Sequence, residues 1–337
     1  MQRIKKVLKA GLIFLVLGVS IPAIAQKHKK QKAKEKAVDL PAVIWRDPGN
    51  ISTLNLIYGA GGSEHAPDPK GTYTFDKEDM HGTSPKFDVK DAQGVTWRIK
   101  LGEEAQPETA ATRLLWAAGY FVDEDYYLPE VKVEGLPKLH RGENLVSKDG
   151  IVPHARLKRR GKESKKIGNW EWSKNPFVGT KELNGLRIMM SLLNNWDLTT
   201  INNSIYVVNG ERRYLVSDVG ASLGKTGNPI SRSKSNLKGY EESKFIEKET
   251  PVEVDFTMHS RPLLVTAVNV PNYQKRTKIE DVTKHIPRAD AKWLGQLLGQ
   301  LSEDQIRDAF RTAGYTPEEV EGYTKEVEKR IATLNAL

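Results

Sequence analysis

Cysteine is absent from this chain of 337 residues, which excludes a disulfide framework, a lipidated cysteine and a cysteine nucleophile. The chain also lacks a G-x-S-x-G motif, and its seven histidines show no spacing typical of metal ligands. Hydrolase chemistry built on a cysteine or on a serine elbow therefore has no support in this sequence.

Long apolar runs are nearly absent too. The run at residues 11–21 is too short to span a bilayer comfortably, follows a basic start and precedes the small-x-small sequence Ala-Ile-Ala at 23–25. This order is typical of a secretory signal peptide, and the alternative is an uncleaved N-terminal anchor. We therefore predict a signal peptide over residues 1–25, export to the periplasm or the cell exterior, and no transmembrane span after cleavage.

An excess of basic charge is missing from most of the chain. The net charge is +9, but residues 1–39 hold ten Lys and Arg against two Asp and Glu, and the rest holds 42 against 41. We therefore expect no nucleic-acid partner, and a disordered basic linker over residues 26–40 that can make weak contact with anionic surfaces. A second basic cluster, HARLKRRGKESKK at 154–166, is interpreted as a solvated loop, with attraction of a phosphorylated or acidic ligand as the alternative.

Strand patterns fill the first part of the chain after the linker. Aromatic and β-branched residues alternate with polar ones there, and the runs end at Gly and Pro turns. A helix is expected to begin at Pro107, which suits the first helical position, and to end at Gly119. The strands are expected at 51–58, 71–80, 87–91, 95–100 and 126–135.

Helical patterns dominate the second part. Apolar residues at helical spacing over 179–195 predict a helix, and the Asn-Gly pair at 209–210 between two apolar runs predicts a hairpin. Residues 222–250 are rich in Gly, Ser and Lys and are expected to form a loop. Capping boxes at Ser302 and Thr316 begin two C-terminal helices.

The order of these elements predicts an α+β fold with two lobes. The N-lobe is small, antiparallel and β-rich, and covers residues 41–153. The C-lobe is larger and mainly helical, and covers residues 154–337.

The segment SLLNNWDLTTINNSIYVVNGERRYLVSDVG at 191–220 carries two aspartates in distinctive positions. Asp197 ends a helical pattern and is followed five residues later by Asn202, and Asp218 ends a strand pattern and begins a D-x-G sequence. Together with the strand that ends at Lys100, this order resembles the protein-kinase-like superfamily. It is similar to the atypical branches: aminoglycoside phosphotransferases, HipA-type kinases, type II phosphatidylinositol 4-kinases and Fam20-type secreted kinases. By motif the resemblance extends over residues 70–225.

The resemblance implies how the β-rich lobe would hold a nucleotide. Lys100 would bind the phosphates, and Glu108 would orient that lysine, with Glu104 as the alternative. Gly82, Thr83 and Ser84 lie between the two strands before Lys100, which is the place of the family's phosphate-covering loop. The glycine cluster at 59–62 is richer in glycine but lies one strand earlier, so the loop at 82–84 is preferred.

The resemblance also implies the chemistry of the second lobe. Asp197 would be the catalytic aspartate that takes the proton of an attacking hydroxyl, and Asn202 and Asp218 would bind Mg²⁺, a hard cation that prefers oxygen ligands. ATP and Mg²⁺ are therefore the expected cofactors, and the acceptor would be a hydroxyl on an unknown protein, sugar or lipid. Asn195-Trp196 stands where the family has a His-containing lead-in. A pseudokinase-like binding module of the cell envelope is thus the alternative function, and nucleotidyl transfer also stays open.

Overall fold

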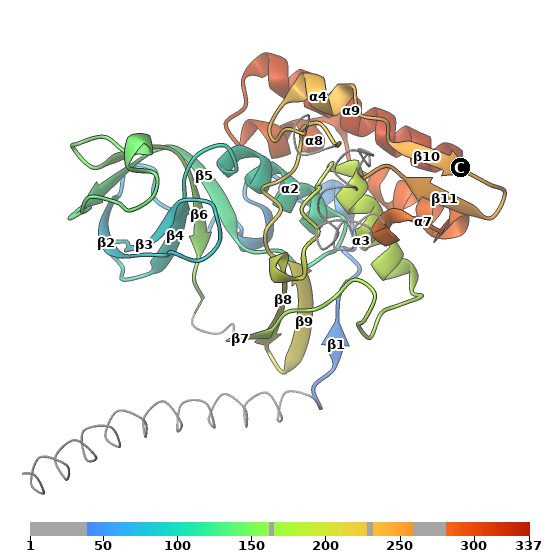
Figure 1. Ribbon diagram of the computed structural model, residues 1–337, viewed down its shortest axis with the longest axis horizontal. Helices are drawn as coiled ribbons and strands as arrows, with labels where there is room; N and C mark the ends of the chain where they lie inside the picture. Colours follow the sequence, from blue (N-terminus) through green and yellow to red (C-terminus); the bar gives the residue numbers. More distant parts are fainter. Residues whose placement is uncertain (1–38, 162–164, 228–231, 259–280) are drawn as a thin grey trace, which may run out of the picture.

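A computed structural model describes residues 39–161, 165–227, 232–258 and 281–337 (Figure 1). The predicted signal peptide at 1–25 and all but the last two residues of the predicted linker at 26–40 lie outside the described residues. Within these residues, no helix is long and apolar enough to cross a membrane.

The β-rich part is a closed five-stranded barrel with the strand order β2-β3-β4-β6-β5. All its pairings are antiparallel except that of β2 with β5, which is parallel and closes the barrel. Its interior is a hydrophobic cluster of its own that contains Phe87, Trp97, Ile99 and Leu157. The strands are β2 (Thr72–Glu78), β3 (Lys86–Lys90), β4 (Thr96–Lys100), β5 (Asp125–Glu134) and β6 (Ile151–Arg159).

Helix α2 (Ala105–Ala117) lies between β4 and β5 in the chain and is buried on almost all its faces. It packs against the barrel strands β5 and β6 on one side and against α8 on the other. Ala110 and Leu114 belong to the large hydrophobic core of the helical part, not to the barrel interior. The helix ends where predicted, because Gly119 takes a φ of +86° beside the backbone of Arg46. Helix α2 therefore contacts both parts.

A second sheet, of order β1-β9-β8-β7, lies beside the barrel (Figure 1). Its strands are β1 (Ala42–Val43), β7 (Lys165–Gly168), β8 (Asn203–Val208) and β9 (Glu211–Val216). The predicted hairpin of β8 and β9 is confirmed, since Asn209 and Gly210 have φ values of +50° and +78°, as a two-residue hairpin turn requires.

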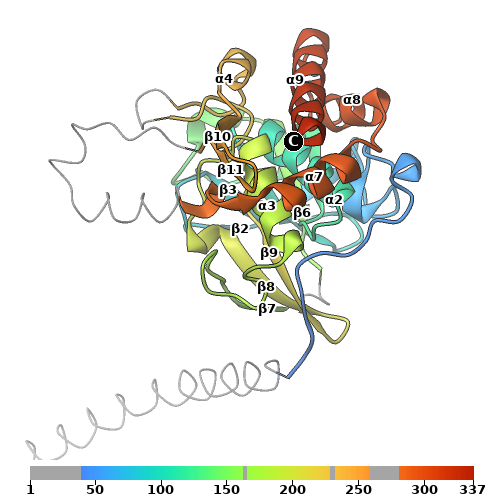
Figure 2. The ribbon, with the colours of Figure 1, turned by 90° about the vertical axis from the view of Figure 1, so that its right-hand side faces the viewer.

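Helices make up most of the larger part. Figure 2 shows α8 and α9 on the side of the molecule opposite β7, β8 and β9. Both predicted capping boxes form, with Ser302 and Gln305 at α8 and Thr316 and Glu319 at α9. The helices are α3 (Lys181–Leu192), α4 (Leu237–Glu241), α7 (Arg288–Leu298), α8 (Glu303–Arg311) and α9 (Pro317–Ala336). A small sheet contains β10 (Ile246–Glu249), β11 (Glu253–Phe256) and β12 (Ile286–Pro287). The described residues also form 3₁₀ turns at Ile51–Thr53, Gly59–Gly61, Glu143–Leu145, Thr200–Asn202 and Asp281–Thr283.

The predicted α+β fold with a β-rich part and a mainly helical part is confirmed. The expected boundary at 153/154, however, falls inside β6, and Ala42 and Val43 pair with β9 of the second sheet instead of joining the barrel. The strand expected at 51–58 is wrong, because Asn50 caps a 3₁₀ turn there by accepting a hydrogen bond from the Ser52 amide. The loop expected at 222–250 contains α4 and β10.

The basic cluster at 154–166 is not a solvated loop in the described residues. Residues 154–159 complete β6, and β7 begins at Lys165. Ala155 and Leu157 point into the barrel, while Arg156 and Lys158 lie on the opposite face and are buried against acidic side chains. The charge run suggested solvent exposure because ion pairing across the fold cannot be read from neighbouring residues.

Candidate functional site

Lys100, the last residue of β4, brings three carboxylates together. Its Nζ lies 2.7 Å from Glu108 Oε2, 2.9 Å from Glu104 Oε2 and 3.1 Å from Asp218 Oδ1. The lysine side chain is only 3% exposed, so these contacts form in a desolvated environment. The structure thus joins the end of the barrel strand, the beginning of α2 and the D-x-G sequence after β9.

The charges of this group support one another. Burial by itself would lower the pKa of Lys100, but Glu108, Asp218 and Glu104 outweigh it and raise that pKa above its usual value. For the two glutamates, burial by itself would raise the pKa. Lys100 and Lys234 instead lower the pKa of Glu104 to about 2, and Arg156 and Lys100 lower the pKa of Glu108 to about 2. Both carboxylates are therefore ionised at neutral pH, and the lysine is protonated.

The two candidate partners of Lys100 have different surroundings. Glu108 is 1% exposed and also accepts a hydrogen bond of 3.0 Å from Arg156 on β6. Glu104 accepts hydrogen bonds from Ser84 at 2.8 Å and from Lys234 at 2.5 Å, so it links the turn before β3 to the larger part. The sequence posed these glutamates as alternatives, whereas both contact the lysine.

Hydrogen bonds with two side-chain amides hold the backbone of the loop that contains Asp197. Asn195 Oδ1 accepts a hydrogen bond of 3.1 Å from the Asp197 amide, and Asn202 Nδ2 donates one of 2.8 Å to the Asp197 carbonyl. The carbonyl of Asn202 in turn accepts from the Ser217 amide at 2.8 Å. Asn202 therefore lies next to the strand end that carries Asp218, and Asn195 fixes the Asp197 backbone in a lead-in that lacks histidine.

Mg²⁺ fits the oxygen donors at this place. The Asp218 side chain is 41% exposed and has one oxygen on Lys100, which leaves the other for a cation. Asn202 uses its Nδ2 inside the loop, which leaves Oδ1 as an acceptor. Carboxylate oxygens of Glu104, Glu108 and Asp218 also lie within 4.8 Å of one another, but the Lys100 ammonium already lies among them.

A cleft of about 430 Å³ opens beside this group, between the barrel and the β8–β9 hairpin. Of the predicted residues, Gly82, Lys100, Glu108, Asn202 and Asp218 line it, whereas Thr83, Ser84 and Asp197 do not. The lining contains eight Lys and Arg against four Asp and Glu. The basic residues are Lys86, Arg98, Lys100, Arg156, Lys158, Arg159, Arg160 and Lys166. An excess of cations in a concave site favours an anionic ligand.

The two glycine segments have different places. Gly82, with a φ of +71°, lines the cleft, and a Cβ there would approach only Lys86 Nζ, at 3.3 Å. The cluster at 59–62 instead packs under α2 and β5: a Cβ on Gly61 would lie 2.1 Å from the Tyr126 hydroxyl oxygen, and one on Gly59 2.6 Å from Arg113. Glycine at 59 and 61 is thus required by packing, and this cluster does not line the cleft.

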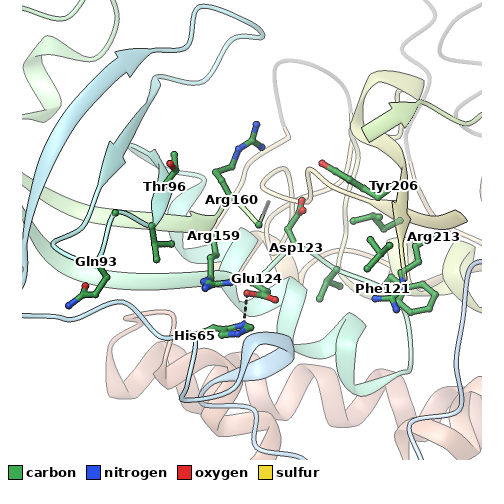
Figure 3. A pocket seen from close by; sticks show the side chains of 16 residues that line it. His65, Gln93, Thr96, Phe121, Asp123, Glu124, Arg159, Arg160, Tyr206 and Arg213 are labelled. Carbon is green, nitrogen blue, oxygen red and sulfur yellow. Dashed lines mark hydrogen bonds and ion pairs between the residues drawn. The ribbon is translucent and has the colours of Figure 1, made fainter. Parts of the chain in front are cut away.

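A second space of about 510 Å³ adjoins the cleft (Figure 3). The two spaces share Asp123, Arg159, Arg160, Gly161 and Tyr206. Figure 3 shows His65 paired with Glu124 at 3.0 Å on one side and Phe121 beside Arg213 on the other. None of the residues predicted for phosphate or metal binding lines this second space.

Two buried cations of the cleft were missed by the sequence interpretation. Arg156 lies between Glu108 and Asp125, and Lys158 donates to Asp123 Oδ2 at 2.6 Å and to the Ser217 carbonyl at 3.0 Å. The alternation of Ala155 and Leu157 with Arg156 and Lys158 was the signal for a strand with one charged face.

Comparison with known proteins gives little more. A scan against protein-family models finds no match for this sequence, and a search of curated proteins finds none either. Among solved structures, the chain is similar to the crystal structure of a Helicobacter pylori proinflammatory kinase, CtkA, at 10% sequence identity and a TM-score of 0.45. The similarity covers 78% of this chain and 96% of that chain. A similarity at this level says nothing of what this chain binds or does.

Proposed function

We propose that this protein is an exported, kinase-like phosphotransferase that moves the γ-phosphate of ATP to a hydroxyl of a protein, sugar or lipid. The observation that carries the proposal is the meeting of Lys100 with Glu108 at 2.7 Å and with Asp218 at 3.1 Å in a cation-rich cleft. Phosphoryl transfer depends mainly on positioning and on neutralising charge, and this cleft offers both.

Binding of the phosphates is assigned to the cations of the barrel. Lys100 supplies a buried ammonium to the cleft, and Lys86 lines the cleft with its Nζ beside Gly82. If Lys100 turned away, the buried Glu108 carboxylate would lose its contact of 2.7 Å with the ammonium and keep only Arg156, which opposes that movement.

Metal binding is assigned to Asp218 and Asn202. When bound, Mg²⁺ supplies charge neutralisation on the phosphate oxygens. The chain orients both ligands, because the Ser217 amide donates a hydrogen bond to the Asn202 carbonyl and so joins the strand end before Asp218 to the loop that carries Asn202.

Proton transfer is assigned to Asp197. The acceptor oxygen attacks the γ-phosphorus, the bond between that phosphorus and the bridging oxygen breaks, ADP leaves, and the Asp197 carboxylate takes the hydroxyl proton. The hydrogen bonds from Asn202 and to Asn195 hold the backbone of Asp197 for this role.

Label transfer tests the proposal. The purified chain without residues 1–25 is incubated with Mg²⁺ and γ-labelled ATP, alone and with candidate acceptors, and mass spectrometry then distinguishes an added phosphate from an added AMP. We expect phosphate addition or label release that disappears in Asp218→Ala. Addition of AMP, or equal activity in the variant, would contradict phosphoryl transfer at this site.

A nucleotide- or partner-binding module without catalysis is the second candidate. One observation favours it: the Lys100 ammonium is enclosed by three carboxylates and is 3% exposed, so it is held by the protein in this arrangement. Little ATP is expected outside the cytoplasm, which also favours binding without turnover. A thermal shift with Mg·ATP that is not accompanied by transfer would select this candidate.

Export and surface contact complete the proposal. The basic start, the apolar run at 11–21 and the Ala-Ile-Ala sequence at 23–25 support export, and the basic composition of 26–40 supports weak contact with anionic lipid or cell wall.

A further inference from the structure

Glu104, the residue before α2, is held by three segments of the chain. Its Oε2 accepts hydrogen bonds from Lys100 at 2.9 Å and from Ser84 at 2.8 Å, and its Oε1 accepts one from Lys234 at 2.5 Å. A Cβ on Gly220 would lie 2.8 Å from the Glu104 Cβ and 2.9 Å from its Oε2, so glycine there lets the carboxylate lie against the backbone of the D-x-G sequence. Glu104 therefore connects the barrel to the segment that follows the D-x-G sequence.

Lys234 balances the charges around Lys100. The Lys100 ammonium contacts the carboxylates of three acidic residues, Glu104, Glu108 and Asp218. Two of these carboxylates also contact a second cation, since Arg156 lies 3.0 Å from Glu108 and Lys234 lies 2.5 Å from Glu104. Among the described residues, three cations thus meet three carboxylates here. Without Lys234, two cations would remain for the three carboxylates, and the surplus negative charge would oppose the binding of phosphate.

The ion pair of Lys234 and Glu104 is screened only in part by water. The side chain of Lys234 is 25% exposed and that of Glu104 is 12% exposed. A change of charge at this place therefore acts on the Lys100 ammonium more strongly than a change on an open surface would. Lys100 lines the cleft, whereas neither Glu104 nor Lys234 does. An effect of Lys234 on a bound phosphate would thus pass through Glu104 and Lys100.

Trp196, in the lead-in that lacks histidine, contacts the segment that carries Lys234. The guanidinium of Arg232 lies 3.8 Å from the centroid of the Trp196 ring, and Lys234 Nζ lies 5.5 Å from it. The Trp196 Nε1–H donates a hydrogen bond of 3.1 Å to the Ser233 carbonyl. Cations are attracted to the face of an indole ring, and the hydrogen bond fixes the backbone of the segment beside that ring. The lead-in is thus connected to Glu104 through Lys234.

We infer that Lys234 is a positioning residue of the proposed reaction. It neutralises Glu104, so that the charge of Lys100 stays available to the phosphates, and Trp196 holds it in place. The inference rests on the proposed function and gives the tryptophan of the lead-in a role in it. Loss of the Lys234 charge should therefore weaken the binding of phosphate, and loss of the Glu104 charge as well should restore it.

Calorimetric titration with Mg·ATP tests this charge rescue. Lys234→Met should weaken binding about tenfold, and the double variant with Glu104→Gln should return to within about threefold of the wild-type chain. Lys234→Arg keeps the charge and should bind as the wild-type chain does. Lys225→Met is the matched control, because Lys225 lies in the same segment but pairs with the exposed Glu242, and it should leave binding unchanged.

The rescue distinguishes an effect on charge from an effect on folding. Unchanged binding in Lys234→Met, or a double variant that stays as weak as Lys234→Met, would overturn the inference and leave the proposed function intact. If urea unfolding shows that Lys234→Met does not fold, Glu104→Gln decides: it should bind Mg·ATP at least as tightly as the wild-type chain, and weaker binding would overturn the inference. No binding of Mg·ATP by the wild-type chain would overturn both.

The role of Trp196 is tested in two backgrounds. Trp196→Leu removes both the ring and the Nε1 donor and should weaken the binding of Mg·ATP about fivefold in the wild-type chain. In the Glu104→Gln background the same substitution should have no effect, because no carboxylate is left there for Lys234 to neutralise. Equal weakening in the two backgrounds would show that Trp196 does not act through Lys234 and Glu104.

Discussion

Lys100 and Asp218 are 118 residues apart in the chain, and Lys100 Nζ donates a hydrogen bond of 3.1 Å to Asp218 Oδ1. One residue ends a strand of the barrel, and the other follows a strand of the second sheet. Their contact closes the inner end of the cleft and connects the two parts of the fold at the place where phosphate chemistry is proposed.

Substitutions of Asp218 and of Asp197 should affect different steps, the first the binding of nucleotide and the second the transfer of phosphate. Asp218→Ala removes the proposed metal ligand and should abolish binding of Mg·ATP in calorimetry. Asp197→Ala removes the proposed proton acceptor but no residue of the cleft lining, so it should retain binding and lower the transfer rate by about 10²-fold or more. Transfer at the wild-type rate in both variants would contradict the assignment of the site.

Lys100→Met should destabilise the fold as well as the site. The variant leaves Glu104, Glu108 and Asp218 close together without their shared cation, and breaking a buried ion pair in this way costs about 3 kcal/mol. Urea unfolding at neutral pH measures the loss. Lys90→Met, which removes a 53% exposed lysine of the same barrel, is the control and should change stability by less than about 0.5 kcal/mol.

Glycine substitutions should show which of the two glycine segments contributes to phosphate binding and which to packing. Gly61→Ala places a methyl group 2.1 Å from the Tyr126 hydroxyl oxygen and should destabilise the fold by about 2 kcal/mol, which urea unfolding will show. Gly82→Ala meets only the end of Lys86 and should cost about 1 kcal/mol for its positive φ while weakening phosphate binding. If Gly61→Ala weakened phosphate binding more than Gly82→Ala without unfolding the protein, the choice of loop would be wrong.

Acid should weaken the group around Lys100. The folded-state pKa of Glu104 is lowered to about 2 from an ordinary value of 4.5, so its contribution to stability is present above pH 4.5 and is lost as the pH falls toward 2. Glu104→Gln should therefore reduce the change in the free energy of unfolding across this pH window by on the order of 2 kcal/mol, which urea unfolding at several pH values measures. Glu103→Gln, which removes the exposed carboxylate next to it, controls for the change in net charge. Equal slopes in the two variants would show that the ion pairs of Glu104 contribute nothing.

A second pH window has the opposite sign. Burial raises the pKa of Asp125 to about 6, because Arg156 and Lys158 only partly offset the loss of hydration. A raised carboxyl pKa contributes stability that is present below its ordinary value of 3.8 and is lost as the pH rises through 6. In Asp125→Asn this decrease between about pH 4 and pH 6 should disappear relative to the wild-type chain. Urea unfolding at several pH values in this range measures the free energy of unfolding of both proteins. An equal dependence of that free energy on pH in the wild-type chain and in Asp125→Asn would contradict the prediction.

Local patterns in the sequence were sufficient for most elements. The strands that end at Glu78 and Lys100, helix α2, the β8–β9 hairpin and the two capped C-terminal helices lie close to their predicted places. Each depends on interactions between residues a few positions apart, such as the Asn-Gly turn at 209–210 or the capping box at Thr316. The strand expected at 51–58 failed because a side-chain cap from Asn50 competes there with extended backbone.

The sequence by itself determined the residue types of the candidate site and their order: a lysine at a strand end, acids at the start of a helix, and Asp197, Asn202 and Asp218 around a hairpin. Only the tertiary structure decided that Glu104 and Glu108 both hold Lys100, that Gly82 and not the cluster at 59–62 lines the cleft, and that Arg156 and Lys158 are buried cations. The physical reason is that burying a charge is costly unless an opposite charge or hydrogen bonds compensate it, and the partners of these residues come from distant parts of the chain. Spacing along a sequence records periodicity and turns, whereas burial and ion pairing exist only once the barrel, α2 and the second sheet are packed together.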